Sequence, residues 1–349
     1  MERKGFLLLL LLVLSLGCFA NGKKETNGTI AEKEVVGESA NKPVTLVVSI
    51  TAANTEENYT GHSLQVFKDT VEKNSNGNVK LDCYWSNALF SQDAETAACI
   101  AGDCDMIYSG ASWLTDGSPW VSMFTSGYFF KSVGHLNSVM NGSIGKEVYE
   151  RIAKEQGILP LGAIYTGSRD ISLSIDKAIK TPSDLKGIKL RMPNSESWMF
   201  LGKALGANPT PVNYSDLYLA LKTGTVDGQD NPVTAMQAAK FYEVQKSITI
   251  TNHVIDSIWP TVNVKKWNSL TKQQQQWIME GFEAARDYCE KANTESVDSA
   301  IDFCKRNGLK VYYADIDAFS KHVQDYYLQS KYSEMWDMDL YKRIQDSAK

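Results

Sequence analysis

The sequence lacks the residue clusters on which most metal sites and many catalytic sites depend. Its 349 residues include only four histidines and six cysteines, no two cysteines are spaced as C-x-x-C, and the histidines do not cluster with them. A structural zinc site is therefore not expected. The patterns G-x-S-x-G, H-E-x-x-H and G-x-x-x-x-G-K-[ST] are also absent, which disfavours the enzymes that carry them. We accordingly predict no metal, no cofactor and no catalytic residues.

The chain also lacks a block of basic residues. It has 36 lysines and arginines against 41 aspartates and glutamates, and its formal net charge is −5. An acidic chain without a basic patch is poorly suited to bind nucleic acid, so we expect no nucleic-acid partner. Beyond residue 17 no apolar run is long enough to span a bilayer, and no transmembrane helix is predicted there.

The chain begins with a leader. A charged start at residues 2–4 precedes an apolar core, Phe6–Leu16, which is too short for a permanent membrane span. This arrangement predicts a signal peptide over residues 1–17. The Gly-Cys pair that follows resembles a bacterial lipobox, which implies that Cys18 is acylated and holds the protein to a membrane. Ser15 departs from the aliphatic residue usual three positions before the cysteine, so a plain signal peptide with an incidental cysteine is the alternative.

Composition separates a tether from a folded body. Residues 18–42 are rich in Asn, Gly, Lys, Glu and Ala and show no sustained apolar periodicity, which is typical of a flexible linker. The remaining residues, 43–349, are long for one hydrophobic core and natural for two lobes. The five cysteines of this body cannot all pair with one another. We expect mostly buried thiols, with one disulfide left open.

Hydrophobic periodicity predicts alternating strands and helices, and therefore an α/β fold. Apolar runs and period-two patterns indicate strands at residues 44–51, 79–85, 104–108, 171–175, 187–192, 248–264 and 309–313. Helical spacing indicates helices at residues 64–71, 94–101, 195–205 and 215–223. Ser215 is the expected N-cap of the last of these. The longest helix is predicted to start at Thr271, where Gln274 completes a capping box, and to run to Cys304.

One stretch carries a dense resemblance to a known family. Residues 181–253 contain, in order, TPSDLKGIKLRMPNSESW, LGANPTPVNYSDLYLALKTGTVDGQDNP and AAKFYEVQKSITITNH. These segments resemble the solute-binding proteins of TRAP transporters, the tripartite ATP-independent periplasmic uptake systems. Weaker similarity extends over the rest of the body. The resemblance implies a two-lobed fold like that of periplasmic binding proteins, with a ligand cleft between the lobes and a long helix that braces them.

The resemblance and the predicted elements together divide the body between two lobes. The first lobe is expected to comprise residues 43–166 plus about 257–296, and the second residues 167–256 plus about 297–349. The strand at 248–264 would then pass from one lobe to the other.

Arg191 is the leading candidate for contact with a ligand. It ends an apolar strand, immediately before Met192 and Pro193, and a guanidinium there is costly to bury unless an anion meets it. Its planar fork of donors fits a carboxylate in a bidentate pair. In the resembled family the arginine of this R-x-P motif pairs with the ligand's carboxylate, which implies that role for Arg191. The alternative partner is an aspartate or glutamate of the chain itself.

Other site residues are implied by the same resemblance. Asn231, in DGQDNP, matches an asparagine that reaches the ligand, although an Asx turn before Pro232 is an alternative role for it. Arg169, in TGSRD, matches a second arginine of the family. The positions that match the wall of the pocket are Pro193, Asn194 and Tyr214, and core packing is the alternative for Tyr214.

The loop after the third strand differs from that of the sialic-acid-binding members. They carry an acidic residue and an arginine where this chain has Gly110 and Trp113. We expect Trp113 to form an aromatic wall, and we place Ser109 in the same loop as a ligand contact. The exchange predicts a smaller or more apolar organic acid than sialic acid. Of the aromatic residues Trp85, Tyr108, Trp113, Trp120 and Trp198, we expect all but Trp113 to belong to the core.

The sequence thus predicts a binding protein and not an enzyme. It would capture a small organic acid on the extracytoplasmic side and deliver it to the membrane subunits of a TRAP transporter. One alternative is a binding protein that reports to a chemoreceptor, and others are a cleft enzyme or the binding protein of an ATP-driven system. The identity of the acid, and a metal ion bridging it to the protein, are left open.

Overall fold

The computed structural model describes residues 42–348. The predicted signal peptide (1–17), the lipidation site Cys18 and all but the last residue of the tether (18–42) lie outside the described residues. The described residues form one compact unit. Within residues 42–348, none of the helices combines the length and the apolar character needed to cross a membrane.

The strands form one ten-stranded sheet in the order β2-β1-β3-β9-β5-β8-β6-β7, with β4 and β10 also paired to β9. Parallel pairs join β1 to β2 and β3, and β6 to β7 and β8, whereas β9 runs antiparallel to β3 and β5. The strands are β1 (Val44–Ile50), β2 (Val79–Tyr84), β3 (Met106–Gly110), β4 (Ile158–Pro160), β5 (Ile164–Leu173), β6 (Lys189–Met192), β7 (Asn208–Pro211), β8 (Gly228–Pro232), β9 (Ser247–Asn263) and β10 (Lys310–Tyr313).

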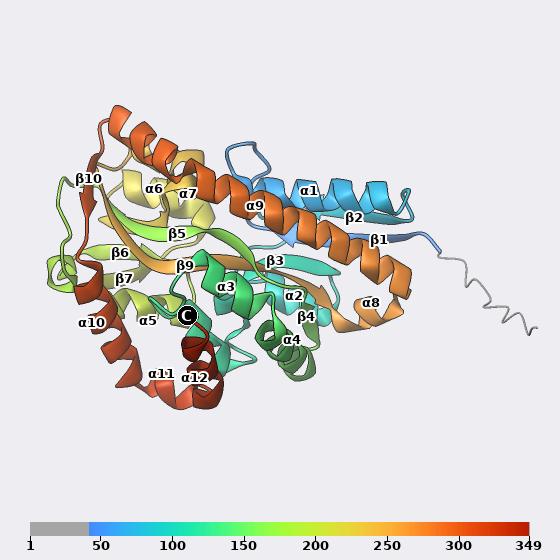
Figure 1. Ribbon diagram of the computed structural model, residues 1–349. Helices are drawn as coiled ribbons and strands as arrows, with labels where there is room; N and C mark the ends of the chain where they lie inside the picture. Colours follow the sequence, from blue (N-terminus) through green and yellow to red (C-terminus); the bar gives the residue numbers. More distant parts are fainter. Residues whose placement is uncertain (1–41, 349) are drawn as a thin grey trace, which may run out of the picture. The chain divides into compact units, whose positions relative to one another are not determined.

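Helices cover this sheet, as the predicted α/β fold requires (Figure 1). They are α1 (Tyr59–Asn74), α2 (Glu95–Ala101), α3 (Val133–Met140), α4 (Ser143–Gln156), α5 (Glu196–Ala204), α6 (Leu217–Lys222), α7 (Val233–Ala238), α8 (Val264–Ser269), α9 (Lys272–Arg306), α10 (Ile316–Leu328), α11 (Lys331–Met335) and α12 (Met338–Asp346). Short 3-10 helices lie between them, of which Ala111–Leu114 and Tyr214–Asp216 border the site described below.

Two long strands, β5 and β9, lie in the middle of the sheet and connect its two halves. The last residues of β9 pair with β3, and its first residues pair with β10. Strand β5 follows β9 along most of this length, with register shifts between Tyr165 and Gly167 and between Arg169 and Ile171. A register shift bends a strand locally and re-aims its side chains. The two shifts therefore mark where the connecting strands change direction.

Helix α9 packs on two separate hydrophobic clusters. Its first half contributes Ile278 and Phe282 to a cluster with α1 and strands β1 to β3, and its second half contributes Ile301 to a cluster with α6 and α7. The predicted capping box is confirmed, since the Gln274 amide donates to Thr271 Oγ1 at 3.2 Å and the Thr271 amide donates to Gln274 Oε1 at 3.0 Å. One rigid helix that packs on both clusters is the predicted brace (Figure 1).

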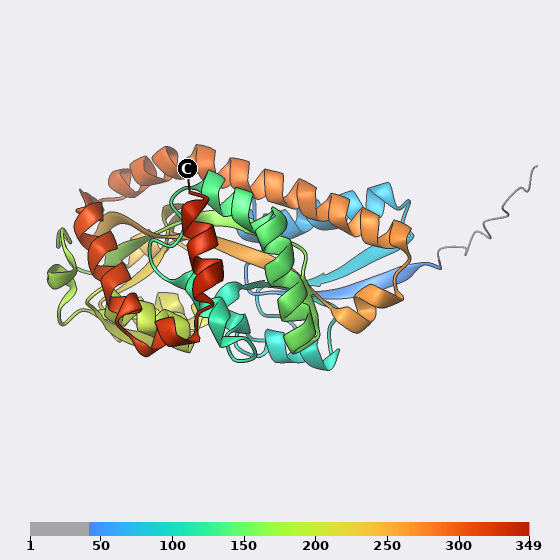
Figure 2. The ribbon, with the colours of Figure 1, turned by 60° about the horizontal axis from the view of Figure 1, so that its bottom comes forward.

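The chain ends on helices that return to the first part of the sequence. In Figure 2 helix α12 lies against α3 and α4. Nε2 of His135 is 3.0 Å from the Ile344 carbonyl oxygen, and Arg343 forms an ion pair with Glu147 at 2.6 Å. The range 297–349, expected in the second lobe, thus includes a segment that contacts residues expected in the first.

Most predicted elements are present with shifted ends. The strand predicted at 104–108 extends to Gly110, and the strand predicted at 171–175 belongs to β5, which begins at Ile164. The N-cap predicted at Ser215 is wrong, because a 3-10 turn precedes α6 and its first residue is Leu217. The five cysteines of the described residues are free thiols, and four of them are buried.

We predict that Gly281→Ala destabilises the protein, although alanine normally favours a helix over glycine by about 1 kcal/mol. A β-carbon at Gly281 would overlap Phe67 and Val71 of α1, and overpacking of this kind costs about 1–3 kcal/mol. Urea unfolding measures the net loss. In the control Gly134→Ala, in α3, the new β-carbon meets no atom closer than 3.7 Å and should not destabilise. A gain of stability in Gly281→Ala would show that α1 and α9 are not closely packed there.

Candidate functional site

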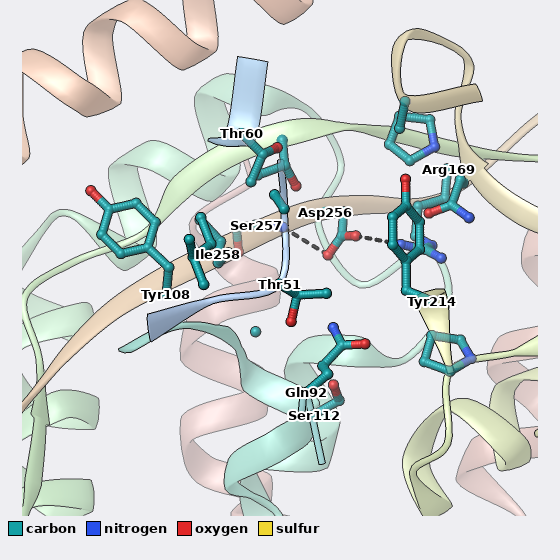
Figure 3. A pocket seen from close by; sticks show the side chains of 18 of the residues that line it. Thr51, Thr60, Gln92, Tyr108, Ser112, Arg169, Tyr214, Asp256, Ser257 and Ile258 are labelled. Atoms are coloured by element: carbon teal, nitrogen blue, oxygen red, sulfur yellow. Dashed lines mark hydrogen bonds and ion pairs between the residues drawn. The ribbon is translucent and has the colours of Figure 1, made fainter. Parts of the chain in front are cut away.

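A cavity of about 150 Å³ opens between the ends of β1 and β3 and the middle of the connecting strands. Figure 3 shows side chains from both parts of the chain around it. Residues 50–113 contribute Ile50, Thr51, Ala52, Asn58, Thr60, Gln92, Tyr108, Gly110, Ser112 and Trp113. Residues 166–258 contribute Thr166, Arg169, Pro193, Trp198, Tyr214, Asn231, Pro232, Ala235, Asp256, Ser257 and Ile258. Amide, hydroxyl and charged groups thus line the cavity together with aromatic rings.

Arg169 is held at the cavity by two aspartates. Its Nε donates to Asp230 Oδ2 at 2.7 Å, its Nη2 to the Asp230 carbonyl oxygen at 2.6 Å, and its Nη1 to Asp256 Oδ2 at 2.7 Å. The guanidinium carbon lies 4.4 Å from the centre of the Trp198 ring, within the range of a cation–π contact. Neighbouring strands supply this set, since Arg169 is on β5, Asp230 on β8 and Asp256 on β9.

The buried charges around Arg169 stabilise one another. Burial alone would raise the pKa of Asp230, but the neighbouring Arg169 outweighs it and holds that pKa well below its usual range. In the same way burial opposes the charge of Arg169, and the two aspartates raise its pKa above the ordinary value. Burial lowers the pKa of His253, whose Nε2 lies 3.3 Å from Asp230 Oδ2. The imidazole is therefore neutral at pH 7, and the network has one arginine and two aspartates as its charges.

Arg191 is buried with an incomplete set of partners. Its side chain is 1% exposed, its Nε donates to the Val212 carbonyl oxygen at 2.8 Å, and its Nη2 has no hydrogen-bond partner within the described residues. Burial lowers the pKa of Arg191 to about 10, so the group is still charged at pH 7. The guanidinium carbon lies 6.0 Å from the ring centre of Tyr214, which lines the cavity. A buried cation with an unused donor is costly unless an anion completes it.

The structure brings together five of the eight predicted ligand contacts. Trp113, Arg169, Pro193, Tyr214 and Asn231 line the cavity, and the Asn231 amide also donates to Gln229. Arg191, Ser109 and Asn194 are not on the cavity wall. Side chains alternate along a strand, so Tyr108 and Gly110 face the cavity while Ser109 between them points to the opposite face. Asn194 is exposed, and Arg191 lies behind Tyr214.

Several residues of the cavity wall were not predicted from the sequence. Trp198 and Tyr108, both expected in the core, line it as well as being buried. Trp198 Nε1 donates to Ser112 Oγ at 2.8 Å, which joins α5 to the 3-10 helix after β3. Asp256 and Gln92 had no distinguishing pattern in the sequence. Asp256 stands within a long strand, and only its pairing opposite Gly167 of β5 reveals that it lies near Arg169.

Asp170, next to Arg169, fastens the irregular part of the connecting strands. Its Oδ1 accepts hydrogen bonds from the backbone amides of Thr251 at 2.9 Å and Asn252 at 3.0 Å, at the second register shift. Burial raises the pKa of Asp170 from 3.8 to about 7, although the two amides act in the opposite direction. This carboxyl group therefore titrates near neutral pH while it positions the strand that carries Asp256.

Metal binding finds no support among the described residues. Between residues 42 and 348 no group of three or more His, Cys, Asp or Glu side chains is arranged to hold a metal ion.

Known proteins resemble this chain over most of its length. The family described as DctP, bacterial extracellular solute-binding protein family 7, matches residues 50–334. The sialic acid-binding periplasmic protein SiaP of Vibrio cholerae is 29% identical over 293 residues, or 83% of this chain and 89% of that protein. The C4-dicarboxylate-binding periplasmic protein DctP of Rhodobacter capsulatus is 30% identical over 259 residues, or 74% of each chain.

A solved structure shares the fold described above. It is a TRAP periplasmic solute-binding protein from Roseobacter denitrificans with bound 3-deoxy-D-manno-oct-2-ulosonic acid (KDO). Its TM-score with this chain is 0.83 at 32% sequence identity, and the match covers 88% of this chain and 100% of that one. The predicted periplasmic-binding-protein-like fold is thereby confirmed.

We predict that Asp170→Asn changes how stability depends on pH. The native carboxyl keeps its proton up to about pH 7, whereas in the unfolded chain it loses the proton near its ordinary value of 3.8. Its contribution to the free energy of unfolding is therefore largest below pH 4 and is lost as the pH rises to about 7. Asparagine can accept the same two backbone hydrogen bonds but cannot titrate.

Urea unfolding of both proteins at pH 5, 6, 7 and 8 tests this prediction. The difference in free energy of unfolding between variant and wild type is free of the contributions of the titrating groups that the two proteins share. This difference should shift in favour of Asp170→Asn as the pH rises. A difference that stays constant over this range would show that Asp170 does not titrate there.

Proposed function

Because this chain belongs to bacterial extracellular solute-binding protein family 7, a family of transport proteins, we propose that it captures a hydroxylated carboxylic acid for a TRAP transporter. Membership of the family identifies the chain as a periplasmic solute-binding protein and not an enzyme.

The unused donor of Arg191 is the observation that carries the proposal. A buried guanidinium that retains its charge and lacks a partner at Nη2 stabilises the protein best when an anion fills that position. The bond from Nε to Val212 fixes the plane of the group, so its orientation is set before any ligand arrives. A carboxylate is the anion whose two oxygens match this planar fork.

The residues on the cavity wall complete the proposed contact set. Asn231 offers an amide to the ligand, while Tyr214, Trp113 and Pro193 form apolar walls. Arg169 has three donor positions engaged by aspartates, so it contributes fixed positive charge and a smaller number of free hydrogen bonds. Ser109 and Asn194 are left out of the proposed set, because Ser109 points to the opposite face of its strand and Asn194 is exposed.

Polar groups of the first part of the chain support a hydroxylated acid. Thr51, Asn58, Thr60 and Gln92 all line the cavity. A purely apolar ligand would leave the Thr51 hydroxyl, which has no hydrogen-bond partner within the described residues, still unpaired. The expectation of a more apolar acid, which rested on Trp113, is therefore modified. The Roseobacter denitrificans protein holds KDO, an acid with several hydroxyl groups, and SiaP of Vibrio cholerae is named for binding sialic acid.

Capture is proposed to occur by closure of two lobes with the predicted limits, 43–166 plus about 257–296 and 167–256 plus about 297–349. The connecting strands β5 and β9, with their register shifts, would supply the hinge. The bond from Trp198 to Ser112 supports this proposal, because it joins the two parts directly beside the cavity. Closure would remove water from the cavity and strengthen the charged hydrogen bonds inside it.

We predict that Arg191→Ala weakens binding of acids such as KDO and D-galactonate at least about 30-fold, because truncating one partner of a buried charge pair costs about 2–5 kcal/mol. Arg191→Lys keeps the charge but loses the fork, so its affinity should lie between those of wild type and Arg191→Ala. Isothermal titration calorimetry of the chain from residue 42 onward gives the affinities. Native mass spectrometry of the same protein identifies any co-purified acid. If Arg191→Ala binds these acids as tightly as the wild type, Arg191 does not hold the ligand carboxylate as proposed.

The lipid anchor is proposed from the leader sequence. The Gly-Cys pair at the end of the signal peptide supports acylation at Cys18, with the tether linking the lipid to the body. In a bacterial host fed a radioactive or alkyne-tagged fatty acid, the full chain should take up the label and fractionate with membranes. Cys18→Ser should lose the label and be released from the membranes. Equal labelling of both proteins would place the lipid elsewhere.

A further inference from the structure

Asp256 brings a negative charge into a cavity that is proposed to receive an acid. It lines the cavity, and its side chain is 20% exposed. Its Oδ2 accepts a hydrogen bond from Arg169 Nη1 at 2.7 Å, and its Oδ1 accepts one from the Ser257 amide at 2.9 Å. Figure 3 shows the carboxylate between these two partners.

The charges at the cavity already balance one another. Arg169 and Asp256 are the charged residues on its wall, and Arg191 and Asp230 lie directly behind it. Two arginines thus face two aspartates. One ligand carboxylate gives the closed site a net charge of −1, and a second carboxylate would raise it to −2 in a space from which water is excluded.

Asp256 also has acceptor capacity left. A carboxylate has about four positions at which it can accept hydrogen bonds, and the described residues occupy two of those of Asp256. A ligand hydroxyl can donate to the remaining positions, whereas a carboxylate cannot donate at all. The Asp256 carboxylate therefore repels a second negative charge of the ligand and can accept a hydrogen bond from a ligand hydroxyl.

From this geometry we infer that Asp256 determines specificity, selecting acids with one carboxylate and several hydroxyls and rejecting dicarboxylates. The inference rests on the proposed function, since it assumes that Arg191 receives the single carboxylate. It assigns this chain a narrower range of ligands than the family as a whole, because the similar protein of Rhodobacter capsulatus is named for binding C4-dicarboxylates.

Matched pairs of acids test this inference directly. D-Gluconate and D-glucarate differ only in one end group, a hydroxymethyl in the first and a carboxylate in the second, and D-galactonate and galactarate form an equivalent pair. Titration calorimetry of the wild-type body should show at least tenfold tighter binding of the monocarboxylate in a pair. In Asp256→Asn, which keeps the shape and removes the charge, that preference should fall at least tenfold.

Asp216→Asn is the matched control, because Asp216 is an exposed aspartate two residues after Tyr214 and is not on the cavity wall. It should leave the preference within each pair unchanged. If Asp256→Asn folds poorly, the preference of the wild-type protein for the monocarboxylate still tests the inferred role. Asp256→Ser then provides a second variant without the charge.

The outcomes separate this inference from the proposed function. If the wild-type protein binds the acids but shows no preference within either pair, or prefers the dicarboxylates, Asp256 does not have the inferred role. The proposed function is then unaffected. A preference that persists in Asp256→Asn overturns the inferred role too. If none of the four acids binds the wild-type protein, the proposed function fails, and the inference that rests on it fails as well.

Discussion

The ion pair between Arg169 and Asp230 is the interaction on which the site depends. Both side chains are buried, and the carboxylate is completely so. A buried charge without its partner is strongly destabilising, so neither residue can be lost without disturbing the strands that carry them. Because these strands are neighbours in the sheet, the pair fixes β5 and β8 relative to each other at the cavity. Trp198 over the guanidinium and His253 beside the carboxylate complete its surroundings.

The two arginines consequently have different tasks. Arg169 is completed by the protein itself, through three hydrogen bonds to two aspartates. Arg191 is oriented by one backbone oxygen and is otherwise incomplete. A site built in this way keeps its shape when empty, since its structural cation is already satisfied. Arg191 still has an unused donor that favours an anion at one defined position. This combination suits a protein that must bind and later release an acid.

Much of the fold follows from local sequence patterns, whereas much of the site does not. The capping box at Thr271 and the periodicity after it were enough to predict α9, because helix signals are local. Arg191 was found through a motif of consecutive residues. Asp256, by contrast, is 87 positions from Arg169, and nothing near it in the sequence indicates that the two meet. Ser109 was misplaced for a smaller reason: the strand was predicted to end at residue 108 but continues to Gly110, and strand alternation then turns Ser109 away from the cavity.

The position of the site within the sheet links ligand contact to the connecting strands. Arg169 and Asp256 lie on β5 and β9, on the segment bounded by the two register shifts, where Gly167 pairs with Asp256 and Arg169 with Val254. Their ion pair therefore crosses from one connecting strand to the other at the point where both bend. A ligand hydroxyl that engages Asp256 acts on the same bond. The residues that would distinguish one acid from another are thus also residues that hold the two bent strands together, which links the choice of ligand to the geometry of the strands.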